Sequence, residues 1–291
     1  MELAVCLTQC EAMIRKGSSS FYHAFSHLPN PKREAVYVIY AFCRMIDDAV
    51  DEPDRSPYTI DEIERAFTDL DQAEGHFIWP SLRWLLQTFP VTKAPFFKQM
   101  EGQRRDLVQT HYESMEQLEE YCYLVAGTVG QMLLPVLHDA PDQHIVEAGI
   151  WLGKAMQIVN IVRDVGEDQG RGRRYLPLDL LDRHGYSEQD FLNGTLDERF
   201  RSLIQELDEL ARSWFALGMK GIETYPPQSM LAVELAANFY AAILDEVKAF
   251  DYQVFTQRAV VSNLRKLKLY GAIKAKYAVL LDTSEDAVVS L

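Results

Sequence analysis

The sequence predicts an all-α protein in which residues 1–291 form one domain of many packed helices. Apolar residues recur with helical period along nearly the whole chain, and no segment alternates apolar and polar residues as a strand would. Short turns containing Gly or Pro separate the periodic segments. With 48% apolar and 25% charged residues, the 291-residue chain has the composition of a globular protein that buries a substantial core.

The first expected helix covers residues 31–51. Pro31 suits its first turn, where a missing N–H group is not needed, and Pro53 and Pro57 end it. Further helices are expected over 60–74, 80–88, 94–111, 116–138, 142–168, 197–223, 229–250 and 254–280, and a Gly/Arg-rich loop is expected over 169–177.

Charge and composition narrow the class of protein. A net charge of −14 argues against a nucleic-acid-binding protein, which would normally carry a basic surface. The N-terminus has an early acid and no long apolar core, so we expect no signal peptide. The longest apolar stretch, 35–43, is far shorter than the roughly 20 residues of a membrane span. We expect a cytoplasmic protein with reduced thiols at Cys6, Cys10, Cys43 and Cys122.

Two pairs of aspartates are the most informative motif. Asp47 and Asp51 lie in the segment R-M-I-D-D-A-V-D, and Asp164 and Asp168 lie in R-D-V-G-E-D. Residues four apart lie on the same face of an α-helix, because one turn contains about 3.6 residues. Like charges on one face repel each other. A chain that repeats this arrangement twice therefore suggests a cation that compensates the charge.

Each pair continues a polar stripe along an otherwise apolar helix. The first stripe is Tyr40, Arg44, Asp47 and Asp51, and the second is Gln157, Asn160, Asp164 and Asp168. Facing helices of a bundle build metal sites in this way. Hard oxygen ligands suit Mg²⁺, which commonly arrives bound to a substrate's phosphates. We interpret the stripes as two walls of a polar pocket inside an apolar body.

Other interpretations compete with a magnesium–diphosphate site. A single aspartate pair would usually be a solvated helix face. A dinuclear iron or manganese bundle would carry Glu-x-x-His pairs, but none of the seven histidines lies within a turn of these aspartates. Residues 149–155 match a phosphate-binding loop only in part, and no strand–GxGxxG–helix pattern indicates tightly bound NAD(P).

Longer segments carry a resemblance to a known family. They are residues 152–177, residues 121–136, and the serine-rich segment 18–29 together with 40–51. In these segments the sequence resembles the squalene/phytoene synthase family of head-to-head prenyl diphosphate synthases, and bacterial dehydrosqualene synthases most of all. The resemblance implies an isoprenoid-synthase-type helical bundle around a central apolar cavity, and a magnesium-dependent prenyltransferase that works without NAD(P).

The resemblance also implies roles for individual residues. Two or three Mg²⁺ ions would be held by Asp47, Asp51, Asn160, Asp164 and Asp168. The four aspartates would be catalytic, together with Tyr40 and Arg44. Contact with the diphosphates or the prenyl chains is implied for Ser18, Ser19, Ser20, Phe21, Phe25, Tyr40, Arg44, Tyr121, Val125, Gln157, Asn160, Arg163, Tyr175, Tyr240 and Arg258. The apolar residues among these would form the cavity wall, although each also suits an ordinary core.

Two glycines lie within the segment 121–136. Gly127 and Gly130 each cost an expected helix about 1 kcal/mol relative to Ala. Close helix packing, or room for a substrate chain, would explain them.

The expected product is dehydrosqualene, a carotenoid precursor made from two farnesyl diphosphates through a cyclopropyl diphosphate. Phe25 would end the cavity before a geranylgeranyl chain fits, and residues 18–29 and 243–247 resemble dehydrosqualene synthases. Residues 100–107 instead resemble phytoene synthases, which use geranylgeranyl diphosphate. An NADPH-dependent squalene synthase and a non-enzymatic assembly factor remain as alternatives. Gly17 departs from dehydrosqualene synthases, which can carry a polar side chain there.

Residues 258–276 contain six basic residues and no acidic one. A solvated helix and a helix that contacts anionic lipid both fit this pattern. Farnesyl diphosphate is the expected small-molecule partner, and a carotenoid desaturase could act on the product. The protein is expected in the cytoplasm, either free or at the membrane surface.

Overall fold

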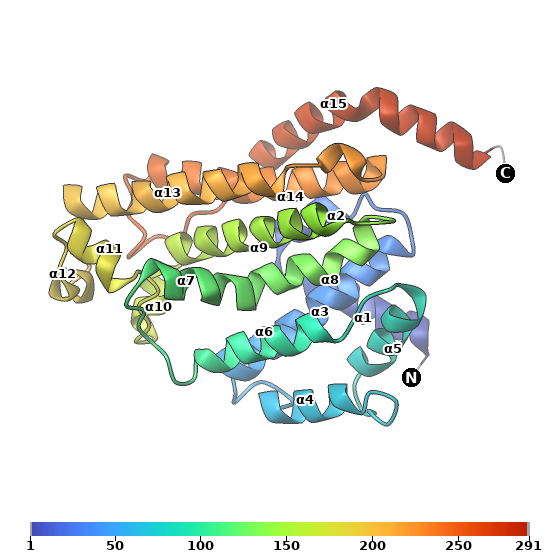
Figure 1. The fold of residues 1–291 in the computed structure, drawn as a ribbon, viewed down its shortest axis with the longest axis horizontal. Coiled ribbons are helices and arrows are strands. Elements are labelled where there is room, and N and C mark those ends of the chain that lie inside the picture. The colour runs from blue at the N-terminus through green and yellow to red at the C-terminus, as the bar shows by residue number, and fades with distance from the viewer. Residues whose placement is uncertain (1, 290–291) are drawn as a thin grey trace.

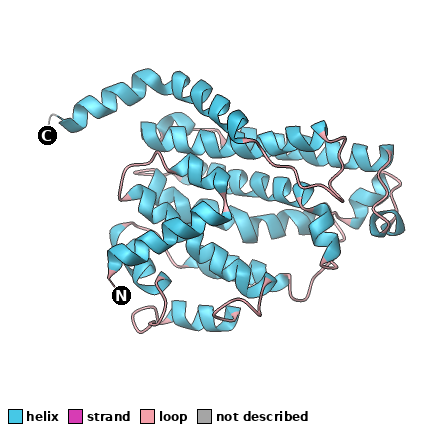
Figure 2. Cartoon of the chain, turned by 180° about the vertical axis from the view of Figure 1, so that it is seen from behind, coloured by secondary structure: helices cyan, strands magenta, loops and turns pink. Residues whose placement is uncertain are grey.

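The computed structural model describes residues 2–289, with side chains described as far as Leu281. Helices make up almost all of its regular structure (Figures 1 and 2). The only extended pairing among the described residues is a single bridge between His111 and Arg174. The prediction of an all-α fold is confirmed.

Fifteen α-helices, one π-helical turn and one 3₁₀ turn follow each other along the described chain (Figure 1). The first seven are α1 (Leu3–Gly17), α2 (Ser19–Phe25), α3 (Lys32–Asp51), α4 (Ile60–Thr68), α5 (Ile78–Thr88), α6 (Ala94–Arg105) and α7 (Met115–Cys122). The π-helix η1 (Tyr123–Gly127) leads into α8 (Thr128–Leu137), α9 (Gln143–Arg163), α10 (Val165–Gly170), α11 (Leu178–Arg183) and α12 (Glu188–Leu192). The chain ends with α13 (Glu198–Gly218), the 3₁₀ turn η2 (Ile222–Thr224), α14 (Pro227–Ala249) and α15 (Asn263–Val289).

The helices are layered around α9 (Figure 1). Helix α9 packs against α13 and α14 on one side and against α8 and η1 on the other, while α3 packs against α1, α5, α6 and α8. Buried apolar residues from α1 to α15 join one hydrophobic cluster. Among the described helices, α9 alone is long and apolar enough to cross a membrane by composition, and 56% of its most apolar window is buried in this fold.

Helices α3, α5 and α14 begin and end within two residues of the expected ranges. Helix α4 ends at Thr68 instead of 74, and α13 ends at Gly218, after which Gly221 takes a φ of 76° and turns the chain. Helices α1, α2, α11 and α12 were not among the expected ranges. Three of these are short, with few turns to display a period, and serine side chains cap α2 and α12.

The expected helix 142–168 is wrong as a single element, because it breaks at Asp164. The backbone of Asp164 leaves helical geometry, with φ −104° and ψ 12°. The N–H group of Gly166 donates to the carbonyl of Val254 at 3.2 Å instead of continuing the helix. A Cβ on Gly166 would overlap the carbonyl of Phe255, so glycine is required where this distant segment crosses.

Three further expected ranges also need correction. The range 116–138 contains α7, η1 and α8, with a π-turn in the middle. Helix α6 ends at Arg105 rather than 111, because the following loop pairs with residues near 174. Residues 254–262 are not helical, since the carbonyl of Val254 bonds across to α10. These departures come from contacts between distant segments, which local periodicity does not contain.

Glycines allow α8 and η1 to lie almost directly on α9. A Cβ on Gly130 would overlap the carbonyl of Gly149, and a Cβ on Gly153 would overlap the carbonyl of Ala126. The expectation of close helix packing at Gly130 is confirmed. This contact places α9 and its polar side chains firmly against the rest of the bundle.

We predict that Gly153→Ala lowers the free energy of unfolding by about 1–3 kcal/mol, because the added methyl group has no space between α9 and η1. Gly271→Ala in α15 is the matched control, since nothing lies within 4 Å of a Cβ there. It should leave stability unchanged or raise it by up to about 1 kcal/mol. Urea unfolding of both variants checks this. Similar effects of the two substitutions would contradict the packing argument.

Candidate active site

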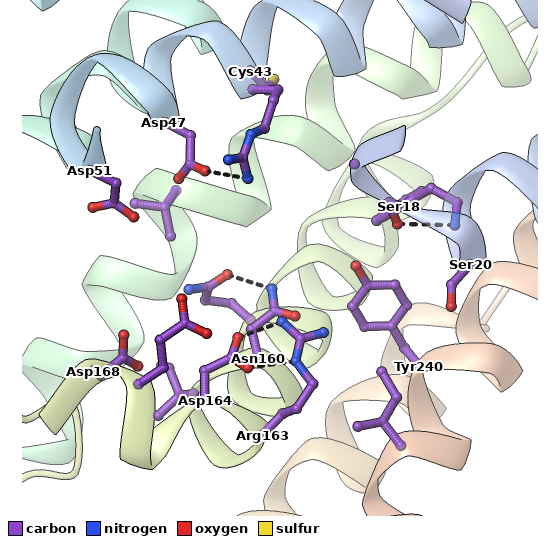
Figure 3. A pocket seen from close by; sticks show the side chains of 18 of the residues that line it. Ser18, Ser20, Cys43, Asp47, Asp51, Asn160, Arg163, Asp164, Asp168 and Tyr240 are labelled. Carbon is purple, nitrogen blue, oxygen red and sulfur yellow. Dashed lines mark hydrogen bonds and ion pairs between the residues drawn. The ribbon is translucent and has the colours of Figure 1, made fainter. Parts of the chain in front are cut away.

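A polar cavity of about 550 Å³ lies among α2, α3, α9, α10 and α14. Figure 3 shows Asp47 and Asp51 on one side of it and Asp164 and Asp168 on the opposite side. The fold therefore brings the two aspartate pairs to one cavity. The other sequence-predicted residues that line it are Ser18, Ser19, Ser20, Phe21, Tyr40, Arg44, Tyr121, Val125, Gln157, Asn160, Arg163, Tyr175, Tyr240 and Arg258.

An apolar cavity of about 210 Å³ adjoins the polar one. The two share Phe21, Tyr40, Val125 and Tyr240 among their walls, so an elongated molecule could occupy both. Phe25 is the one predicted site residue that lines only the apolar cavity; it is 2% exposed and stacks on Phe21 with ring centroids 5.6 Å apart. Ala126, Val129 and Leu133 line the same cavity.

The first aspartate pair carries more negative charge than its neighbours compensate. Arg44 pairs with Asp47 at 3.2 Å and also with Asp48, and Gln103 Nε2 donates to Asp47 Oδ1 at 3.4 Å. Burial raises the pKa of Asp47 to about 7, with the negative charge of Asp51 adding to the effect. A cation placed beside Asp47 would relieve this cost.

The Gly/Arg-rich loop after α10 reaches across to the first pair. Arg171 Nη1 donates to Asp51 Oδ2 at 2.7 Å, and Arg173 Nη1 donates to Asp51 Oδ1 at 2.6 Å. Tyr175 continues from this loop into the cavity wall. The loop therefore links the two aspartate motifs through ion pairs, which sequence spacing did not predict.

The two members of the second pair differ in their charge balance. Asp164 accepts from Arg163 Nε at 2.8 Å and from Arg258 Nε at 2.7 Å. Burial alone would raise the pKa of Asp164, but these two guanidinium groups outweigh it and lower the pKa. Burial, followed by the charge of Asp164, raises the pKa of Asp168 to about 7. Asp168 is therefore the undercompensated member.

Asn160 carries a buried polar atom that has no partner. Its Oδ1 atom is buried without a hydrogen-bond partner, while its Nδ2 donates to Gln157 Oε1 at 3.2 Å. Among the described residues, no three His, Cys, Asp or Glu side chains converge closely enough to hold a metal by themselves. A cation that bound here would complete its coordination with oxygens of a bound molecule or water.

Lys266 is a cavity residue that the sequence analysis missed. It is only 5% exposed, its Nζ donates to Ser19 Oγ at 2.8 Å, and burial lowers its pKa. Both sequence-based interpretations of residues 258–276, a solvated helix and a lipid-contacting helix, place this lysine at the surface, and for Lys266 that is wrong. The signal that could have corrected this is helical period, because Ile273 and Tyr277, on the same face of α15 as Lys266, are also buried.

Asp106 is a second missed residue. It lies in the segment 100–107, which the sequence analysis used only as a marker of product type. Tyr121 donates to Asp106 Oδ2 at 2.8 Å, and the hydroxyl oxygens of Tyr121 and Tyr175 are 3.3 Å apart. Burial raises the pKa of Asp106 to about 6, and its Oδ1 has no hydrogen-bond partner. These residues form a polar cluster in the cavity wall.

Gly17 lies at the rim, directly before the three serines. A Cβ there would overlap the hydroxyl of Tyr40. In this chain the Tyr40 hydroxyl thus occupies the position that a polar side chain would need. Burial raises the pKa of Tyr40, so its hydroxyl stays protonated and able to donate.

Comparison with known proteins identifies relatives along nearly the whole chain. A family model described as squalene/phytoene synthase matches residues 14–265. The chain is 39% identical over 274 residues to the phytoene synthase of Arthrospira platensis, covering 89% of each chain. It is 39% identical over 276 residues to the 15-cis-phytoene synthase of Synechocystis, covering 89% of this chain and 81% of that protein. A dehydrosqualene synthase solved with a ligand superposes with a TM-score of 0.89 at 34% identity, covering 95% of this chain and 98% of the other.

We predict that Asp47→Asn and Asp164→Asn change stability in opposite directions at pH 8 without divalent metal. The folded-state pKa of Asp47, about 7, lies above its reference value of 3.8, so its charge destabilises the fold increasingly as the pH rises from about 4 to 7. The pKa of Asp164 is lowered, so its charge stabilises the fold above the unfolded-state pKa and is lost as the pH falls. Each change should amount to about 1–2 kcal/mol after solvent screening.

Urea unfolding with a chelator at pH 8 and pH 5 checks the prediction. Asp47→Asn should stabilise more at pH 8 than at pH 5, and Asp164→Asn should destabilise at both. Asp54→Asn is the control, because Asp54 is exposed and pairs with no cation among the described side chains. A stabilised Asp164→Asn, or a destabilised Asp47→Asn, would overturn the charge assignment.

Proposed function

Because the chain belongs to the squalene/phytoene synthase family, whose members are prenyltransferase-type enzymes acting on prenyl diphosphates, we propose that it condenses two farnesyl diphosphates head to head into dehydrosqualene. One observation carries the proposal. A polar cavity with two facing aspartate pairs opens onto an apolar cavity that Phe21 and Phe25 line. The first suits diphosphates, and the second suits prenyl chains.

Magnesium fits the polar cavity. The unpartnered oxygen of Asn160 and the raised pKa values of Asp47 and Asp168 mark positions that lack positive charge. We propose that these three residues, with Asp51 and Asp164, hold two or three Mg²⁺ ions together with the substrate's diphosphates. Bound there, Mg²⁺ would supply Lewis-acid neutralisation of the leaving diphosphate.

Basic side chains of the cavity would bind the diphosphates. The cavity is lined by Arg163 at the end of α9, by Arg258 in the segment 251–262 and by Lys266 on α15. Arg44 lines it from α3. Their guanidinium and ammonium groups are positioned before the reaction, so they would stabilise the developing charge of the leaving group without large rearrangement. Serines 18–20 and the Tyr40 hydroxyl offer further donors at the same end.

The proposed reaction balances without an external oxidant or reductant. One C1–O bond breaks and releases diphosphate, and the C2–C3 double bond of the second substrate attacks the resulting C1 cation. Loss of a proton then closes the three-membered ring and gives a cyclopropylcarbinyl diphosphate. The second C–O bond breaks, the skeleton rearranges to a 1,1′ linkage, and loss of another proton gives the central triene. Two diphosphates and two protons are released, and no NAD(P) is required. The apolar cavity would protect each cation from water.

Our assignment of the substrate's chain length depends on the position of Phe25. Its ring is buried and stacked on Phe21, so it narrows the apolar cavity and favours the shorter farnesyl chain. Geranylgeranyl diphosphate, with phytoene as product, is the second candidate, because the relatives at 39% identity are phytoene synthases. In either case we propose a cytoplasmic enzyme whose product a carotenoid desaturase would consume.

We predict that the purified protein with farnesyl diphosphate and Mg²⁺ releases diphosphate and forms dehydrosqualene, with the same product mass when NADPH is added. Asp47→Asn and Asp164→Asn should each lower turnover by at least about a hundredfold, because both carboxylates face the reacting diphosphates. Mass spectrometry of the product and a diphosphate-release assay provide the readouts. Absence of diphosphate release from either prenyl substrate would favour a non-enzymatic relative instead.

We also predict that Phe25→Ala allows geranylgeranyl diphosphate to be used, since removal of the ring lengthens the apolar cavity. The ratio of products from equal mixtures of the two substrates should shift toward the longer one by about tenfold or more. Leu28→Ala is the control, because Leu28 is 1% exposed but does not line the cavity. An unchanged ratio in Phe25→Ala would show that other residues set the chain length.

A further inference from the structure

Helix α15 has a buried inner face and an exposed outer face. On the inner face, Lys266, Ile273 and Tyr277 are 5%, 6% and 5% exposed. Tyr270 stacks on His27 with centroids 4.6 Å apart. Lys276 Nζ donates to Glu234 of α14 at 2.8 Å. These contacts hold the first part of α15 against α2 and α14, beside the substrate-binding serines.

The outer face combines apolar and basic side chains. Leu264 and Leu267 are 64% and 63% exposed, and Val260, just before the helix, is 64% exposed. Lys268 and Lys274 are exposed on the same face as the two leucines, at positions i+4 and i+10 from Leu264. Five of the eleven exposed large apolar residues in the described chain lie between 260 and 280. Such a concentration normally marks an interaction surface.

The basic side chains of residues 258–276 differ in whether they have a polar partner within the protein. Four of the six basic residues have polar partners within the protein: Arg258 binds Asp164, Arg265 binds Asp245 at 2.6 Å, Lys266 binds Ser19, and Lys276 binds Glu234. Arg265 and Lys266 are therefore not free surface charges. Lys268 and Lys274 make no ion pair among the described residues, although Lys274 Nζ lies 5.7 Å from the ring centroid of Tyr270. No acidic residue occurs from Arg258 to Leu281.

The outer face begins at the rim of the substrate cavity. Arg258, Val260, Val261 and Lys266 line the polar cavity, and Leu264 follows within one turn. In Figure 1, α15 runs over the edge of the bundle and projects beyond it toward the C-terminus. A surface that met Leu264 and Leu267 would therefore lie next to the cavity entrance.

We propose that Val260 and the outer face of α15 dock on an anionic lipid bilayer. An amphipathic helix of this kind lies in the interface, with its leucines in the acyl boundary and its lysines at the headgroups. The net charge of −14 does not prevent docking, because charges farther than about 8 Å from the contact are screened at physiological salt. The placement rests on the proposed function in one respect: an apolar product explains why the entrance should meet a membrane.

Apolar insertion should dominate over charge, because only two lysines remain on the outer face. The test is co-sedimentation of the full-length protein with phosphatidylcholine vesicles, with and without phosphatidylglycerol. Leu264→Gln/Leu267→Gln should weaken binding by at least about tenfold, because two leucine side chains no longer insert. Lys268→Glu/Lys274→Glu should remove the preference for phosphatidylglycerol. Glutamine retains helix propensity, so the first variant should keep α15 folded.

Matched controls lie away from α15. Leu192→Gln on α12 replaces a leucine that is 62% exposed, and Lys220→Glu reverses an exposed lysine after α13. Both should bind vesicles as the wild type does. Equal binding by the wild type and the double leucine variant would overturn the proposal. Conversion of a wild-type dimer into a monomer by that variant would also overturn it, since the face would then bind a second copy.

Diphosphate release in detergent micelles separates this proposal from the proposed function. The α15 variants should retain wild-type turnover there, because Leu264, Leu267, Lys268 and Lys274 do not line either cavity. Vesicle binding without turnover in the wild type would refute the enzyme proposal and leave the docking surface intact. Turnover in micelles without vesicle binding would refute the docking surface and leave the enzyme proposal intact.

Discussion

Negative charge confined between helices is the constraint on which the site depends. Helices α3, α9 and α10 bring four aspartates to one cavity, where the charge of an uncompensated carboxylate destabilises the fold. Arginines donate to both carboxylate oxygens of Asp51 and lower the pKa of Asp164, whereas Asp47 and Asp168 keep raised pKa values. The protein thus maintains a negative site with one satisfied and one unsatisfied carboxylate in each pair. The two unsatisfied carboxylates are the ones that the proposed cations would neutralise.

This compensation also explains the irregular backbone around the site. Arg258 belongs to the irregular segment 251–262, which crosses α10 and accepts a hydrogen bond from the N–H group of Gly166. That crossing ends α9 at Asp164, and the short helix α10 then directs Arg171 and Arg173 toward Asp51. A single uninterrupted helix would have preserved the stripe of aspartates but carried the following arginine loop elsewhere.

Helices α2 and α15 connect the polar chamber to its apolar extension and to the outside. Helix α2 begins with serines at the polar cavity and ends with Phe25 in the apolar one. Lys266 of α15 donates to Ser19, so the same helix that supplies a cavity lysine also carries exposed leucines at the rim. The proposed substrate binding, chain-length limit and product route would therefore all involve neighbouring elements.

The sequence by itself determined the all-α class, most of the long helices and the residues of both aspartate stripes, because helical period and four-residue spacing are local properties. The tertiary structure decided the break at Asp164, the pairing of Arg171 with Asp51 from 120 positions away, and the burial of Lys266. Each of these depends on which segments meet in space. Spacing in the sequence shows which side chains share a helix face. Only packing determines which arginine pairs with which aspartate and which lysine is buried.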